Sequence, residues 1–192
     1  MSVTLIPGTA PMAKPVAYRP FARALHWTTA LIVLGMIPAG IVMLQPGLDR
    51  PVQNLLFMVH KNMGVVVLLL VLVRLAYRAA YPPPPLPRSV PDWQRRVSGL
   101  THALLYAALL VMAVSGYVRV VAGGFPLEWW DALGVPRLVP RSDALAGAAK
   151  TVHWAAHYAI IALVILHVGA ALYHAVIKRD GVLARMWPAL GR

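Results

Sequence analysis

The sequence contains no cysteine. This absence excludes disulfide bonds, iron–sulfur clusters, thiolate ligation of haem iron and covalent attachment of a c-type haem. Acidic residues are also scarce, since the 192 residues include 6 Asp and Glu against 18 Lys and Arg. Charged residues make up 12% of the chain, whereas a soluble domain usually carries about 25%. A surface with so few charges cannot all face water.

Long stretches of the chain are apolar and lack charge altogether. Residues 24–48, 97–118 and 151–177 contain no Lys, Arg, Asp or Glu, and a fourth apolar stretch at 55–77 is interrupted by Lys61 and Arg74. Each stretch is close to or above the roughly 20 residues that a helix needs to cross a bilayer. Backbone groups inside lipid must be hydrogen-bonded within their own segment. We therefore predict an all-α, integral membrane four-helix bundle, with spans at about 24–44, 55–77, 100–120 and 151–177.

The remaining segments predict three parts of the chain. Residues 1–23 are expected to be a flexible N-terminal tail, 24–178 the four-helix domain, and 179–192 an interfacial C-terminal segment. The first apolar stretch is interpreted as an uncleaved anchor, because no apolar core precedes Lys14. The longest connection, 121–150, contains Trp129 and Trp130, which suit the membrane interface.

The distribution of basic residues predicts the orientation. Four spans place both termini on one side, and 12 of the 18 Lys and Arg lie in the tail, the second connection and the C-terminal part. The positive-inside rule therefore predicts that both termini are cytoplasmic. Because the net charge of +12 lies largely outside the apolar stretches, we expect membrane lipid as a partner and no nucleic acid.

All seven histidines lie in the predicted spans or at their ends. They are His26, His60, His102, His153, His157, His167 and His174. Polar residues at membrane depth are costly and usually face a bundle interior or a pathway. Imidazoles without carboxylates at the same depth favour ligation of a metal or of haem iron over proton-coupled transport.

Counting residues from the ends of the predicted spans places four of these histidines at two depths in the membrane. His26 near the start of the first span and His167 in the second half of the last span can share one level. His60 and His153, near the starts of the second and fourth spans, can share the other. His153 and His167 are 14 residues apart, which puts them on one helix face with a rise of roughly 21 Å. Two stacked haems, each bridging the last helix to another helix, fit this separation.

Other polar residues leave alternatives open. His157 lies one turn from His153 and competes with it as a ligand, whereas His102 is interpreted as structural or interfacial. Arg74 either extends to the membrane surface or contacts a haem propionate or a quinone. His174 either contacts a quinone headgroup or is an interfacial histidine.

Several segments together resemble the bacterial cytochrome b561 family. They are Arg23–Trp27, Val59–Gly64, Val73–Arg78, Leu100–Tyr106, Val152–Trp154, Leu166–His167 and Met186–Pro188. The resemblance covers nearly the whole chain from Tyr18 onward and is closest to the small stand-alone members similar to superoxide oxidase. The chain departs from them in its longer N-terminal tail and in the 121–150 connection, whose sequence does not match.

The resemblance implies a di-haem b cytochrome of the bacterial inner membrane that exchanges electrons with the quinone pool. It implies that His26 and His167 hold the cytoplasmic-side haem iron and that His60 and His153 hold the periplasmic-side haem iron. It also implies a superoxide:ubiquinone oxidoreductase, which oxidises superoxide at the periplasmic face and reduces ubiquinone. On this interpretation His174 and Arg74 lie near the quinone.

Three functions remain open from the sequence. The first is the stand-alone superoxide:ubiquinone oxidoreductase, whose anionic substrate could be drawn by the basic residues of the third connection and its flanks. These are Arg119, Arg137, Arg141 and Lys150, with Glu128, Asp131 and Asp143 diluting the positive field. The second is a cytochrome b subunit that couples a dehydrogenase or hydrogenase partner to quinone. The third is a haem-free membrane transporter.

Overall fold

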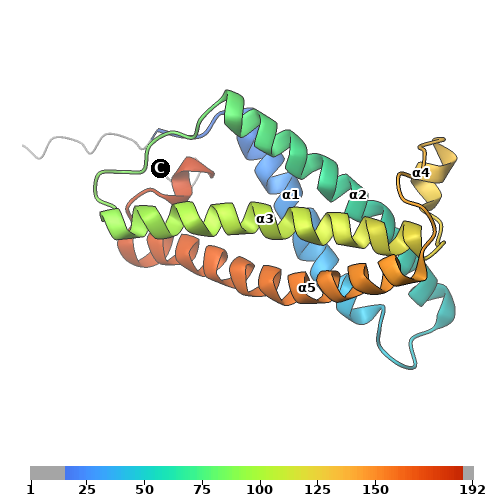
Figure 1. Cartoon of the computed structure of the whole chain (residues 1–192). Helices are drawn as coiled ribbons and strands as arrows, with labels where there is room; N and C mark the ends of the chain where they lie inside the picture. The colour runs from blue at the N-terminus through green and yellow to red at the C-terminus, as the bar shows by residue number, and fades with distance from the viewer. Residues whose placement is uncertain (1–15, 188–192) are drawn as a thin grey trace, which may run out of the picture.

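The computed structural model describes residues 16–187, and this part of the chain is helical without any strand. Most of the predicted N-terminal tail and the last residues of the predicted C-terminal segment lie outside the described residues. Figure 1 shows how the helices are arranged. The elements are α1 (Pro20–Val42), α2 (Arg50–Ala80), α3 (Asp92–Ala122), α4 (Glu128–Ala132), α5 (Asp143–Leu172), the π-helix η1 (Tyr173–Lys178) and the 3₁₀-helix η2 (Leu183–Arg185).

Four helices are long and apolar enough to cross a membrane. They are α1, α2, α3 and the continuous helical stretch Asp143–Lys178. Large apolar side chains such as Leu31 and Ile165 are about two-thirds exposed, at 68% and 67%. Lipid suits such faces, and the helical hydrogen bonds satisfy the backbone there. The prediction of an all-α bundle with four spans is confirmed.

The helices are longer than hydropathy predicted. The third begins at Asp92 rather than near residue 100, and the last begins at Asp143 rather than near 151. Hydropathy detects only the part of a helix that lies in hydrocarbon, whereas the helix continues through the headgroup region. Local signals set the residues at which these two helices begin. Pro91 occupies the N-cap of α3, and the side chain of Ser142 accepts a hydrogen bond from the amide of Leu145 at the start of α5.

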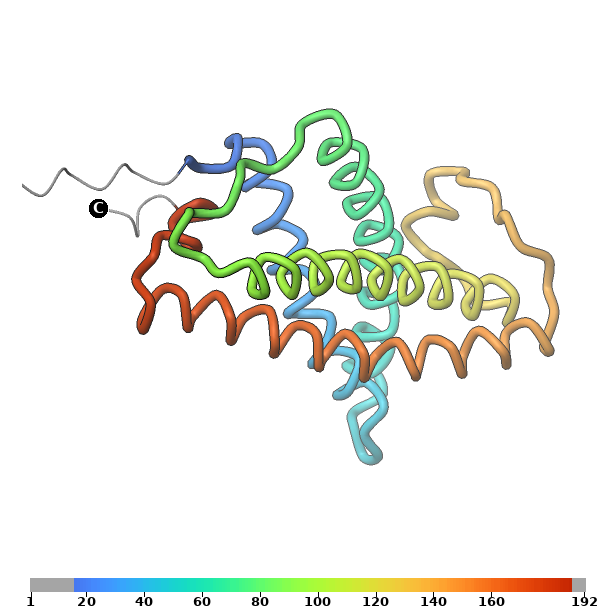
Figure 2. The backbone as a smooth tube through the Cα atoms, turned by 60° about the vertical axis from the view of Figure 1, so that its left-hand side comes forward, coloured from blue at the N-terminus to red at the C-terminus, as the bar shows by residue number. Residues whose placement is uncertain are grey.

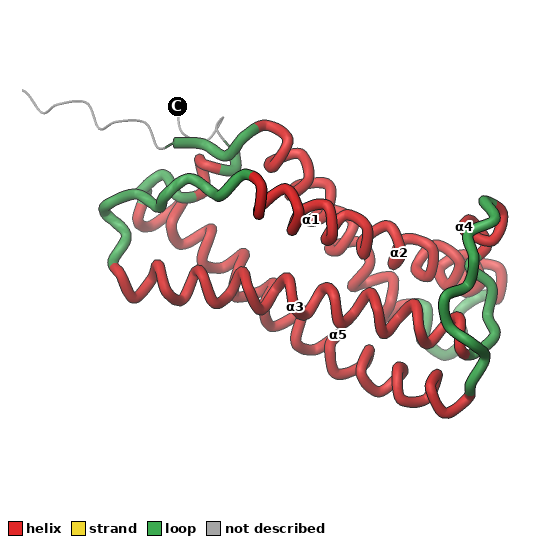
Figure 3. The backbone as a smooth tube through the Cα atoms, turned by 45° about the horizontal axis from the view of Figure 1, so that its top comes forward, coloured by secondary structure: helices red, strands yellow, loops and turns green. Residues whose placement is uncertain are grey.

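The long helices form two layers. Extensive helix–helix contacts join α1 to α2 and α3 to α5, and α2 also packs against α3. Figure 3 shows the α1–α2 pair above the α3–α5 pair, and Figure 2 shows the two pairs crossing at an angle. Side chains that connect α5 to α1 or α2 therefore reach from one layer to the other.

The two ends of the described chain meet at one end of the bundle, which we call the terminus end. The amide of Tyr18 donates to the carbonyl oxygen of Arg185 at 3.0 Å, and the Trp27 indole donates to the carbonyl oxygen of Met186 at 3.2 Å. The buried Arg185 guanidinium also donates to the carbonyl oxygen of Pro84. These contacts hold the segment after η1 against the start of α1.

The opposite end, which we call the α4 end, is closed by the connection that carries α4. Asn62 of α2 is fully buried beneath it. Its amide nitrogen donates to a Glu128 carboxylate oxygen at 2.7 Å, and its amide oxygen accepts from the Trp129 backbone amide at 3.1 Å. Lys61 pairs with the other Glu128 oxygen at 2.8 Å. The connection is thus attached to α2 beside His60.

We expect Asn62→Ala to loosen the α4 connection without unfolding the bundle. The variant loses hydrogen bonds to a charged and a neutral partner, about 2–4 kcal/mol of local stability. Limited trypsin digestion checks this, since Arg137 and Arg141 offer cleavage sites within the connection. Cleavage there should accelerate more than about tenfold.

A matched control is Gln45→Ala, which removes an exposed hydrogen bond to the Ile41 carbonyl oxygen in the other connection at the same end. Its digestion rate should equal that of the wild type. Equal rates for Asn62→Ala and Gln45→Ala would contradict the role given to Asn62.

Candidate functional site

His60 of α2 and His153 of α5 face each other across the two layers. Their ring centroids are 6.5 Å apart with an interplanar angle of 78°. We call them the α4-end pair. The Nδ1 atom of His60 is buried and has no hydrogen-bond partner among the described residues. A buried, unsatisfied imidazole nitrogen is costly, so this pair is suited to a ligand that the protein itself does not supply.

The tautomer of His153 leaves one ring nitrogen available for ligation. Its Nδ1 lies 3.0 Å from the carbonyl oxygen of Met112, and a carbonyl can only accept, so Nδ1 carries the proton. Nε2 then presents its lone pair, the usual arrangement of a ligating histidine. The rival, His157, instead contacts its neighbour Tyr158 at 5.4 Å between centroids. The geometry favours His153, whose role as ligand stays a prediction.

Two glycines make room for the α4-end pair. A Cβ at Gly40 of α1 would meet His60 Cε1 at 3.0 Å, and a Cβ at Gly116 of α3 would meet His153 Cε1 at 3.0 Å. Each imidazole therefore lies directly on the backbone of a neighbouring helix. The hydropathy pattern does not reveal Gly116 as a contact of His153, because the contact joins two helices.

His26 of α1 and His167 of α5 form a second pair, which we call the terminus-end pair. Their ring centroids are 6.2 Å apart with an interplanar angle of 67°. His102 of α3 lies against the same ring, 5.3 Å from the centroid of His167. The structure thus brings the predicted partners together and adds the imidazole of His102, which the sequence predicts to be structural or interfacial.

Arg74 points into the bundle at the terminus-end pair. Its guanidinium donates to Nδ1 of His26 at 3.2 Å and lies 3.4 Å from the hydroxyl of Tyr106. The interpretation of Arg74 as a residue that extends to the membrane surface does not fit this position. Its contact with a propionate or a quinone stays a prediction.

Both histidine pairs fit a metalloporphyrin. A metal–imidazole bond is about 2.0 Å and the ring centroid lies about 1 Å behind the nitrogen, so two rings on opposite sides of one ion have centroids roughly 6 Å apart. The observed centroid distances of 6.2 and 6.5 Å agree with this. Within residues 16–187 no group of three or more His, Cys, Asp or Glu could hold a bare metal ion. A porphyrin supplies four nitrogens itself and needs only two from the protein.

The predicted quinone contact His174 lies at the terminus end, in η1. Its Nδ1 is 2.6 Å from a carboxylate oxygen of Asp180. A cavity of about 240 Å³ also opens at this end, lined chiefly by Tyr18, Arg19, Tyr77 and Tyr81. Neither Arg74 nor His174 lines this cavity, so the structure does not join the two predicted quinone contacts in one pocket.

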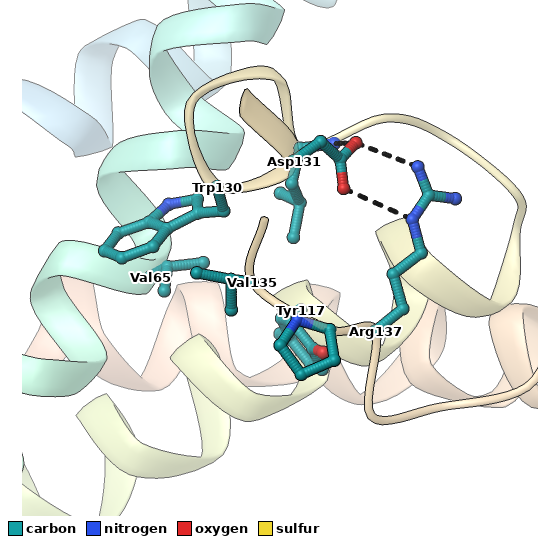
Figure 4. Close-up of a pocket in the computed structure, with 8 residues that line it drawn as sticks. Val65, Tyr117, Trp130, Asp131, Val135 and Arg137 are labelled. Carbon is teal, nitrogen blue, oxygen red and sulfur yellow. Dashed lines mark hydrogen bonds and ion pairs between the residues drawn. The ribbon is translucent and has the colours of Figure 1, made fainter. Parts of the chain in front are cut away.

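The cavity at the α4 end is small, about 30 Å³, and lies between Trp130, Tyr117 and the ion pair of Asp131 with Arg137 (Figure 4). It has room for little more than a water molecule. The hydrogen bond from Arg137 holds the pKa of Asp131 below its ordinary value. Partial burial raises the pKa of Glu128, but hydrogen bonds from Lys61 and Asn62 outweigh it and lower that pKa overall. Both acids therefore stay ionised and neutralise basic partners.

Four apolar spans with imidazole pairs at two levels define a class of protein, the helical membrane proteins that transfer electrons. The sequence model of the prokaryotic cytochrome b561 family matches residues 17–189. Because this match covers most of the chain, the protein belongs to the prokaryotic cytochrome b561 family. It is a multi-pass bacterial membrane protein for electron transfer, and the family implies that it binds haem b.

Curated relatives agree with this assignment. The chain is 30% identical over 173 residues to cytochrome b561 homolog 2 of Escherichia coli (strain K12), covering 90% of this chain and 92% of the relative. It is 32% identical over 172 residues to cytochrome b561 homolog 1 of the same organism, covering 85% and 93%. It is 27% identical over 169 residues to the probable superoxide oxidase CybB of Yersinia pestis, covering 85% and 92%.

We expect loss of one haem when either pair is broken. His60→Ala and His153→Ala should lower the haem content from about two to about one per chain, and His26→Ala and His167→Ala should do the same at the other level, because bis-histidine ligation needs both rings. Pyridine haemochrome absorbance against protein concentration measures the stoichiometry.

The controls are His157→Ala and His102→Ala, which should retain both haems. Full haem content in His153→Ala together with a loss in His157→Ala would transfer the ligand role to His157. A wild type with one haem or none would overturn the two-level assignment.

Gly116→Ala should disturb one haem only. The added methyl group must displace the His153 ring, which lies 3.0 Å from the new carbon. Redox titration should shift one midpoint potential by about 60 mV, a tenfold change for a one-electron couple. Gly35→Ala is the control, because its Cβ would meet nothing within 4 Å. Identical titrations for the two variants would contradict the predicted role of the α4-end pair.

Proposed function

We propose that this protein is a superoxide:ubiquinone oxidoreductase with two haem b groups, one between His26 and His167 and one between His60 and His153. The observation that carries the proposal is the centroid spacing of these pairs, 6.2 and 6.5 Å, at two levels of the bundle. Haem b between two imidazoles supplies one-electron chemistry without an open iron position. Two superoxide anions give up one electron each, and one quinone takes up two electrons and two protons.

The proposal places both termini in the cytoplasm, so that the α4 end faces the periplasm. The excess of Lys and Arg at the terminus end supports this orientation. The haem-free transporter considered from the sequence is disfavoured by membership of a cytochrome family.

Arg74 has a specific task in this arrangement. Its hydrogen bond to His26 requires an unprotonated Nδ1, whereas a histidine that ligates iron through Nε2 keeps the proton on Nδ1. Arg74 then needs another acceptor. A haem propionate or a quinone carbonyl oxygen, both acceptors, would serve.

The name of the Yersinia pestis relative and the charges at the α4 end support superoxide as the donor. Glu128 neutralises Lys61, and Asp131 neutralises Arg137. Over the described residues Arg119, Arg141 and Lys150 form no ion pair, so they leave a net positive field at this end. Such a field raises the encounter rate of small anions.

We expect superoxide to reduce the haem of the purified protein and ubiquinone to reoxidise it. Superoxide generated in the absence of other reductants, followed by absorbance of the reduced b-type bands, measures the first step. Superoxide dismutase should abolish it, and adding a ubiquinone analogue should restore the oxidised spectrum. Haem that stays oxidised under a superoxide flux would exclude superoxide as donor.

A matched pair of variants tests the charge argument. Arg141→Gln with Lys150→Gln should slow reduction by superoxide about tenfold at low ionic strength and remove most of its salt dependence. Arg88→Gln, at the terminus end, should leave both unchanged.

A second function is favoured by one observation. Phe125, Leu133 and Leu138 of the α4 connection are 59%, 74% and 79% exposed, and exposed apolar side chains are typical of docking surfaces. A cytochrome subunit that accepts electrons from a dehydrogenase or hydrogenase partner would use them. Co-purification of a stable redox partner from native membranes would favour this function over direct oxidation of superoxide.

A further inference from the structure

The last membrane helix changes its geometry where it leaves the bundle. After Leu172 the helical turns widen into the π-helix η1, which contains His174. π-helical turns are uncommon and often occur at functional sites. His174 lies seven residues beyond His167, roughly 10 Å further along the axis. It is thus the next imidazole outward from the terminus-end pair.

The chain reverses direction directly after η1 and brings an acid back onto this histidine. Arg179 adopts a left-handed conformation with φ 51° and ψ 36°, and Gly181 has φ 80°. Left-handed backbone at a residue other than glycine is costly. The turn places Oδ2 of Asp180 at 2.6 Å from Nδ1 of His174, while Oδ1 accepts from the Val182 amide at 3.2 Å.

This carboxylate is unusual for its position. Of the 6 acids in the chain, all of which lie in the described part, only Asp92 and Asp180 are at the terminus end. The Asp92 side chain is 93% exposed, whereas those of Asp180 and His174 are 10% and 13% exposed. A carboxylate that is nine-tenths buried and bonded to one imidazole is oriented for that imidazole.

The neighbouring charges do not compete for Asp180. Lys178 lies over the ring of Tyr173, and the Arg179 guanidinium donates to the carbonyl oxygen of Val176. On the adjacent η2, Arg185 lies over Tyr18 and hydrogen-bonds to Pro84. Among the described side chains the acid is therefore engaged by His174 alone.

We infer that Asp180 is a positioning residue that orients His174 to deliver protons to the quinone, an inference that rests on the proposed function. An ionised carboxylate can only accept, so Nδ1 of His174 carries a proton toward Asp180. Nε2 is left as the exchangeable position, and a carboxylate behind the ring stabilises the imidazolium that carries a proton there.

The proton balance follows from the overall reaction. Reduction of one quinone to quinol takes up two electrons and two protons, one proton at each carbonyl oxygen. The His174 imidazolium gives one proton through Nε2, so that an N–H bond breaks and an O–H bond forms. The neutral imidazole then takes up a proton from cytoplasmic water and repeats the transfer. Asp180 neither gains nor loses a proton over the cycle.

The test separates quinone reduction from all earlier steps. Holoprotein is reduced with dithionite in detergent and mixed with a short-chain ubiquinone in a stopped-flow instrument, and haem reoxidation is followed by absorbance. His174→Gln should slow reoxidation about 100-fold, as expected for loss of a general acid. Asp180→Asn should slow it about tenfold, as for loss of a residue that orients a functional histidine. Asp180→Glu should recover most of the rate.

Three controls make the result specific. Haem content and the rate of haem reduction by superoxide should equal those of the wild type in all variants. Asp92→Asn, which removes the exposed acid at the same end, should leave reoxidation unchanged. The solvent deuterium isotope effect on reoxidation should change in Asp180→Asn, which a purely structural role would not produce.

Nuclear magnetic resonance of isotope-labelled histidine gives a readout without quinone. The wild type should show a strongly downfield Nδ1 proton that disappears in His174→Gln and moves upfield in Asp180→Asn. A wild type that reduces quinone as fast as Asp180→Asn would overturn the role of Asp180 and leave the proposed function intact. A wild type whose haem is not reoxidised by quinone would overturn both, even if the downfield proton is present.

Discussion

The structure depends on one constraint, which is that an imidazole at membrane depth must find a partner inside the protein. Lipid offers no hydrogen bonds, so a lone histidine on a lipid-facing surface would remain unsatisfied. The last membrane helix contributes to two such partnerships, because His153 faces His60 of α2 and His167 faces His26 of α1. These cross-layer pairs coincide with the spacing that one ligated ion requires, and the two-layer packing keeps them opposed.

The two ends of the bundle differ in chemistry. At the α4 end, ion pairs and the buried Asn62 close the connection against α2, and Glu128 and Asp131 neutralise Lys61 and Arg137. At the terminus end, a buried acid faces an imidazole at the exit of α5. Oxidation of superoxide releases an electron without a proton, whereas reduction of a quinone consumes protons. On the proposed function, this asymmetry matches the needs of the two half-reactions.

Arg74 and His102 contact the terminus-end pair and give it additional polar neighbours. A guanidinium and a third imidazole lie within contact of His26 and His167. A fixed positive charge beside a redox group stabilises its reduced form and attracts anionic groups. The α4-end pair instead lies against Gly40 of α1 and against Gly116 and the Met112 carbonyl oxygen of α3. The two pairs therefore differ in their immediate contacts, although their ring spacings are almost the same.

The sequence by itself determined the number of spans, the helical class and the two histidine levels. A helix rises by a fixed distance per residue, so counting residues from a span boundary gives depth for His26, His60, His153 and His167. Counting does not give direction around the axis or contacts between segments. Only the tertiary structure decided that His102 joins His167, that Asn62 holds the α4 connection, and that a left-handed turn returns Asp180 to His174. Those contacts join residues through packing and a chain reversal, which no periodicity along one helix encodes.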